Sequence, residues 1–195
     1  MPLRQFLTAA SFALGAVPTV ALAQDANWFV GFGIGQMKTN GACPVNAAPG
    51  TDCEEKNTSW KIVGGYQFNT YLGVELGLDD FGNLPASVSG IGSASVSFRI
   101  FELTLVGTLP LSQRTSVYAK AGIFQWNADY DFAVGNSAFG DASGKDYTYG
   151  LGVKYQLTRN TALRLEWQRY NNVGDPATTG KFNADVLGAG AVLSF

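Results

Sequence analysis

The sequence predicts an all-β fold, an antiparallel barrel of eight strands that crosses a membrane. Three observations predict it: about eight segments alternate apolar and polar residues, their connections alternate strictly between long and short, and the chain begins with an export signal. The clearest segment, residues 161–172, puts Leu163, Leu165 and Trp167 on one face. That spacing has the period of a strand and not of a helix.

The first 23 residues have the features of a secretory signal. Arg4 precedes an apolar run over residues 6–22, and the small residues Ala21 and Ala23 flank Leu22 just before Gln24. We therefore predict a cleaved signal peptide over residues 1–23 and one barrel domain over residues 24–195. No later segment approaches the 18 consecutive apolar residues of a membrane-spanning helix.

The expected strands cover, in order, residues 27–37, 58–68, 71–81, 95–109, 115–128, 146–157, 161–172 and 182–195. The fifth is irregular, because Phe124 and Trp126 fall on its polar face, and we expect a bulge there. Long connections over residues 38–57, 82–94, 129–145 and 171–181 alternate with short ones over residues 69–70, 110–114 and 158–160. Outer-membrane barrels have this alternation, with short turns in the periplasm and long loops outside, which predicts the outer membrane of a Gram-negative bacterium.

A secreted β-sandwich is the rival fold, since its strands also alternate. It would turn the apolar face to a core and the charged face to water. It explains neither the alternation of loop lengths nor the terminal Phe195 of an alternating strand.

The composition argues against nucleic-acid binding and against catalysis. The chain has 13 Lys and Arg, 15 Asp and Glu and no His, so it lacks the basic excess that would hold nucleic acid. Enzymes in small outer-membrane barrels tend to use a histidine as general base, so we expect no enzyme. Pairs of Ser and Asp in the loops, such as Asp141 with Ser143, are expected to cap turns and not to catalyse hydrolysis. We also expect no metal and no cofactor.

The two cysteines, Cys43 and Cys53, lie in a polar loop rich in Gly, Pro and Asn. In an exported protein this predicts a disulfide, which would stabilise so short a loop by about 2 to 3 kcal/mol at most. A metal site is the weaker reading, because no histidine completes it.

Six charged residues are expected on the inner face of the barrel. They comprise three acids and three bases: Glu75, Glu102, Lys120, Lys154, Arg164 and Glu166. An unpaired charge is costly inside a membrane, so we expect ion pairs that fill the lumen. The alternative is a gate in which a cation exchanges carboxylate partners and opens a narrow ion channel of low conductance.

Three segments, GYQFNTYLGVELGLDDFG, ELTLVGTLPLSQRTSVYAKAG and LRLEWQRYNNVGD, resemble the transmembrane domain of the outer membrane protein A family. The resemblance covers residues 27–195 and implies a small barrel with a filled interior. It places Glu75, Arg164 and Glu166 at charged interior positions of the family. The resemblance also implies the gate described above, since interior charges form one in the family barrel. Val106 stands where the family usually has lysine and Lys154 where it has glutamate, and these two departures argue against a gate in this chain. The family's peptidoglycan-binding domain is not in this sequence, so the resemblance does not imply attachment to the cell wall.

These observations predict a monomeric structural barrel that serves envelope integrity or adhesion. Outer-membrane lipids and lipopolysaccharide are its expected surroundings, and loops carrying Phe132 and Phe139 could meet a host or surface ligand. Phe195, with Leu193 and Ala191, resembles the signal read by the barrel-assembly machinery, and we favour that role over packing at the membrane interface, which is the alternative.

Overall fold

A computed structural model describes residues 28–40, 51–53, 56–88, 92–133, 139–174 and 181–195 of the chain. The elements in these ranges are all strands: β1 (Trp28–Asn40), β2 (Thr51–Cys53), β3 (Lys56–Gln67), β4 (Leu72–Val88), β5 (Gly92–Pro110), β6 (Thr115–Ala133), β7 (Phe139–Gln156), β8 (Thr161–Val173) and β9 (Phe182–Ser194). Within those ranges, no helix is long and apolar enough to cross a bilayer.

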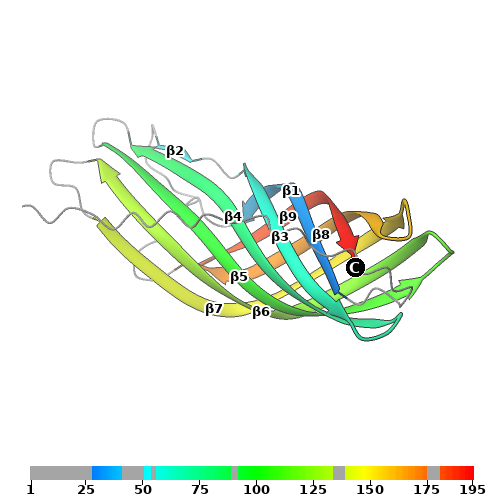
Figure 1. The fold of residues 1–195 in the computed structure, drawn as a ribbon. Helices are drawn as coiled ribbons and strands as arrows, with labels where there is room; N and C mark the ends of the chain where they lie inside the picture. Colours follow the sequence, from blue (N-terminus) through cyan, green and yellow to red (C-terminus); the bar gives the residue numbers. More distant parts are fainter. Residues whose placement is uncertain (1–27, 41–50, 54–55, 89–91, 134–138, 175–180) are drawn as a thin grey trace, which may run out of the picture.

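Eight long strands close into an antiparallel barrel (Figure 1). Their order is β4-β3-β1-β9-β8-β7-β6-β5, and the pairing of β5 with β4 completes the circle. The short β2 pairs with the outer part of β4, beyond the end of β3. Closure matters in lipid because an open edge would leave backbone groups without hydrogen-bond partners.

The burial pattern confirms the predicted inversion, with apolar side chains outside and charges inside. Along β8, Leu163 and Leu165 are 46% and 55% exposed, whereas Gln168, on the inward face of the same strand, is buried. Along β5, Phe101 is exposed while Glu102 is fully buried. A water-soluble sandwich would have the opposite arrangement, so the structure excludes the rival fold.

Three short turns lie together at one end of the barrel, and each is held by its own side chain. Asn69 accepts hydrogen bonds from the backbone N–H groups of residues 71 and 72. Ser112 and Thr158 accept the corresponding bonds in the next two turns. Asn, Ser and Thr favour tight turns for this reason, and their positions fix the register of the three hairpins.

Two of the predicted long loops are largely strand. β4 and β5 stay paired as far as Val88 and Gly92, and β6 and β7 as far as Asp131 and Phe139, so both hairpins extend well beyond the other strands (Figure 1). Residues 82–94 are rich in Ser and Gly, which suggested a loop, but strand pairing uses backbone groups that every residue except proline has in full.

The predicted bulge in the fifth strand is wrong. β6 pairs without a register shift with both of its neighbours, and Phe124 and Trp126 simply face inward, 2% and 4% exposed. The shifts occur instead in β4, next to Gly82, and in β8, next to Asn172. Both residues have positive φ, 65° and 50°, a conformation that Gly and Asn adopt most readily.

Candidate functional site

The lumen contains a network of ion pairs centred on Lys120 of β6. Its ammonium nitrogen lies 2.6 Å from Glu166 Oε1, 3.3 Å from Glu75 Oε1 and 3.4 Å from Glu102 Oε1. The Lys120 side chain is completely buried. An ammonium has three N–H donors, so three carboxylates from three different strands match its bonding capacity.

Arg164 of β8 links two of the same carboxylates. Its Nη1 lies 2.6 Å from Glu75 Oε2 and its Nη2 lies 2.8 Å from Glu166 Oε2. Its Nε donates to the hydroxyl of Tyr118, which in turn donates to Glu166 Oε2 at 2.7 Å. The rigid, planar guanidinium thereby constrains the orientation of both carboxylates more strictly than the flexible ammonium of a lysine would.

Two members of the network were not predicted. Lys61 of β3 lies 2.6 Å from Glu102 Oε1 and 3.4 Å from Asp79 Oδ1. The signal for both was present in the sequence, because Lys61 lies between the outward Trp60 and Ile62, and Asp79 lies four residues after Glu75 on the same face. Alternation applied to every charged residue of β3 and β4 would have found them.

Lys154, one of the six predicted members, lies outside the network. It is half-buried on β7, directly opposite Arg164 in the register with β8. In the part of the chain that the structure describes, no salt bridge includes it. Its cross-strand neighbour is another cation, and like charges opposite each other repel.

The network therefore has four carboxylates and three cations, an excess of one negative charge. The fourth carboxylate is Asp79, which is 4% exposed and whose Oδ2 has no hydrogen-bond partner among the described residues. Glu102 is the opposite case, because Gln168 and Tyr170 both donate to its Oε2, at 2.5 and 3.0 Å. A buried oxygen without a partner is costly, so Asp79 is the weak point of the network.

An apolar cluster fills the lumen on the side of the long connections. Its members are fully or nearly fully buried: Met37, Phe81, Phe98, Ile100, Phe124, Trp126, Ala128, Tyr170, Val173, Phe182 and Ala184. The Tyr170 ring meets Phe81 and Phe124 edge to face, with centroids 5.4 and 5.2 Å apart. We call this cluster the aromatic plug. It was not predicted, because Phe124 and Trp126 on the polar face of their strand suggested a bulge.

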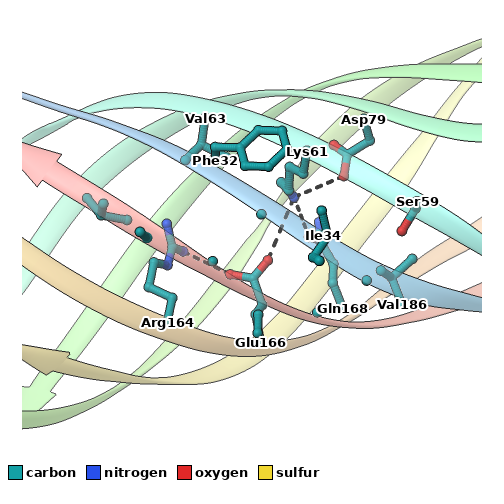
Figure 2. A pocket seen from close by; sticks show the side chains of 17 residues that line it. Phe32, Ile34, Ser59, Lys61, Val63, Asp79, Arg164, Glu166, Gln168 and Val186 are labelled. Atoms are coloured by element: carbon teal, nitrogen blue, oxygen red, sulfur yellow. Dashed lines mark hydrogen bonds and ion pairs between the residues drawn. The ribbon is translucent and has the colours of Figure 1, made fainter.

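A small cavity of about 60 Å³ lies beside the ion network (Figure 2). Glycines of β1 and β9 thin its wall, and Gly33 pairs directly with Gly190. Lys61, Asp79 and Glu166 of the ion network also line the cavity. The space has room for roughly two waters and offers them polar partners.

The arrangement holds charge and closes the barrel, and it offers no obvious reaction centre. The described residues include no group of three His, Cys, Asp or Glu side chains that could hold a metal ion. Every carboxylate of the network except Asp79 has at least two cationic partners. Such paired carboxylates are poor general bases, because their charge is already compensated.

Three further predictions concern Phe195, the two cysteines and the signal peptide. Phe195 follows β9, is 69% exposed, and donates its backbone N–H to the carbonyl of Trp28 at 2.9 Å. Cys43 lies outside the described residues, as does the whole of residues 1–27, so the disulfide with Cys53 and the signal peptide stay predictions.

The closed wall, the apolar exterior and the filled, charged lumen define a small outer-membrane β-barrel. A model of the OmpA-like transmembrane domain matches residues 23–195. The chain therefore belongs to that family, and it is a protein of the outer membrane of Gram-negative bacteria. The family is one of structural barrels and not of enzymes.

The relatives agree with this assignment. Outer membrane protein A of Klebsiella aerogenes is 33% identical over 178 residues, which cover 88% of this chain and 49% of that protein. This chain thus spans about half the length of the relative it matches. Two solved structures share the fold. Neisserial surface protein A has a TM-score of 0.63 and 16% sequence identity, and the match covers 86% of this chain and 97% of that one. Ail, the attachment invasion locus protein of Yersinia pestis, has a TM-score of 0.57 and 15% sequence identity, and the match covers 88% of this chain and 100% of that one.

Proposed function

We propose that this protein is a structural barrel of the outer membrane whose lumen does not conduct. The observation that carries the proposal is the double filling of the lumen, by the ion network in the middle and by the aromatic plug above it. An ion on this route would have to break compensated salt bridges and then pass through closely packed rings. Both steps are costly in a narrow, low-dielectric space.

Single-channel recording in planar bilayers tests the proposal. We expect small or no openings from the unaltered protein. Tyr170→Ala removes the ring that joins Phe81 to Phe124 and should raise conductance. Tyr147→Ala is the matched control, because Tyr147 is 55% exposed on the lipid side of β7. Steady openings of nanosiemens size from the unaltered protein would overturn the filled-lumen proposal and support the runner-up, a narrow ion channel.

A role in surface contact is the second part of the proposal. The support is the length of two hairpins, β4–β5 and β6–β7, which project beyond the rest of the barrel (Figure 1). Ail, which shares the fold, is by its name an attachment protein. Deleting residues 133–143 should reduce adhesion to host cells or surfaces, and unchanged adhesion would remove this hairpin from consideration.

We further propose that the chain performs no chemistry of its own. The sequence has no histidine, and three of the four lumen carboxylates are held by two or more cations. Purified protein should leave lipid A and peptide substrates unchanged. Turnover of either would contradict the proposal.

Export and assembly complete the proposal. The signal over residues 1–23 is removed, the barrel-assembly machinery reads the strand that ends in Phe195, and the folded chain is a monomer. The mass of protein purified from outer membranes should show Gln24 as the first residue. Migration on a gel should shift on heating, because a folded barrel resists detergent until it is boiled.

A further inference from the structure

Charged side chains also occur on the lipid-facing side of the strands, and they are mainly basic. Where the structure describes these side chains, five are Lys or Arg and two are Asp: Lys38, Lys56, Arg99, Lys145, Arg169, Asp80 and Asp185. All lie toward the long connections. This surface is thus unlike the ion network of the lumen, in which four carboxylates meet three cations.

Four of these residues form a single row across neighbouring strands. In the register of the sheet, Lys56 of β3 is opposite Lys38 of β1, Lys38 is opposite Asp185 of β9, and Asp185 is opposite Arg169 of β8. Adjacent strands lie about 4.8 Å apart, so the row is roughly 15 Å long. We call it the basic rim; its net charge is positive, with three cations and one anion.

Arg169 is held in place within the rim. Its Nε and Nη2 donate to the two oxygens of Asp185, at 2.7 and 2.6 Å, and Asn40 also donates to Asp185. Its guanidinium carbon lies 5.8 Å from the centre of the Trp167 ring. A third of the side chain stays exposed. Asp185 therefore orients the guanidinium, and three of its five N–H groups are not used in bonding Asp185.

The rim lies at the upper border of the apolar surface. The next row of outward-facing residues toward the short turns consists of Gln36, Leu187 and Trp167. The row after that consists of Ile34, Ala189 and Leu165. The long connections of an outer-membrane barrel face the cell exterior. The rim therefore lies at the level of the headgroups of the outer leaflet, directly above lipid-facing Leu and Ile side chains.

We propose that the basic rim binds the phosphate groups of a phosphorylated glycolipid in the outer leaflet. Lys38, Lys56 and Arg169 supply the positive charge, and a guanidinium fits phosphate oxygens in pairs. The acyl chains of the same molecule lie along the apolar rows below. A free anion would gain only the first set of contacts, and a neutral lipid only the second. The inference rests on the outer-membrane location and on the lipids and lipopolysaccharide expected around the barrel, and it does not depend on whether the lumen conducts.

Binding to the unaltered, refolded protein in micelles of a neutral detergent is the first test. The ligands are purified lipid A, its enzymatically dephosphorylated form, and inorganic phosphate, with complexes counted by native mass spectrometry. We expect lipid A to bind at least about tenfold more tightly than the dephosphorylated form, as loss of one charge-assisted contact implies. Equal binding of the two lipids would overturn the proposal, and so would equally tight binding of inorganic phosphate.

A double substitution localises the site. Lys38→Gln with Arg169→Gln should weaken lipid A binding by about tenfold to a hundredfold. Arg99→Gln with Lys145→Gln removes the same charge from outward-facing positions on β5 and β7 and should change it less than about twofold. Lys38→Arg should retain binding. Equal weakening by the two double substitutions would show a diffuse charge effect and would refute the rim as a site.

Discussion

Replacing Lys120 by methionine tests whether compensated charge holds the lumen together. The ammonium is fully buried and lies within 3.4 Å of three carboxylates. A methionine side chain has almost the same length and volume as a lysine side chain, so the substitution removes the charge without creating a sizeable cavity. The remaining network would have four carboxylates and two cations in a space closed to bulk water.

The expected cost follows from what each carboxylate retains. Removing one partner of a buried ion pair costs about 3–5 kcal/mol, because the remaining charge stays buried without compensation. Here Glu75 and Glu166 keep Arg164, and Glu102 keeps Lys61. We therefore expect the lower part of the range, about 3 kcal/mol. With a urea dependence of roughly 1–3 kcal/mol per molar, the midpoint should fall by about 1 to 3 M.

The assay is reversible urea unfolding in lipid vesicles, followed by tryptophan fluorescence. Lys154→Met is the matched control, since Lys154 faces the same lumen half-buried and makes no ion pair that the structure shows; its loss should cost less than about 1 kcal/mol. Asp79→Asn is the converse change, which removes the excess carboxylate and should leave stability equal or higher. Equal midpoints for the Lys120 and Lys154 variants would refute the reasoning and show that the lumen is solvated.

Three other predictions concern assembly and covalent structure. Gly122→Ala should sharply reduce the amount of folded barrel, because a Cβ at this position would collide with the backbone of β5. Gly64→Ala is the control and should fold normally, because the atom nearest to its Cβ would be 3.9 Å away. The heat-dependent gel shift measures the folded fraction of both variants. Non-reducing peptide mapping should join Cys43 to Cys53, and unlinked cysteines in protein purified without reductant would contradict the disulfide. Deleting Phe195 should lower the amount of assembled barrel in outer membranes while export continues, and unchanged amounts would leave Phe195 only a packing role at the membrane interface.

Alternation was sufficient to predict the fold and most of the lumen. It assigned Glu75, Glu102, Lys120, Arg164 and Glu166 to the interior, and each faces inward. It failed where an expectation about residue type overruled the period of two. Two aromatic residues on the polar face of the fifth strand suggested a bulge, although a lumen can be filled by rings as well as by ions.

The remaining errors have a different physical origin. Which cation meets which carboxylate depends on the stagger between strands that are distant in sequence, as for Lys61 of β3 and Glu102 of β5. The pattern within one strand carries no information about that stagger. The lengths of the two long hairpins were missed for a similar reason, since backbone pairing beyond the membrane needs no apolar face.

Asp79, the least compensated carboxylate of the network, faces a cavity that is also lined by glycines of β1 and β9. Asp79 lines the same cavity of about 60 Å³ as Gly33 and Gly190, and its Oδ2 is the network oxygen that lacks a protein partner in the described residues. Any side chain at either glycine would fill part of that space, and at Gly190 a Cβ would lie 2.5 Å from the carbonyl oxygen of Phe32. The glycines thus allow β1 and β9 to approach each other, and they also leave room for water to solvate the one carboxylate that the cations do not fully compensate.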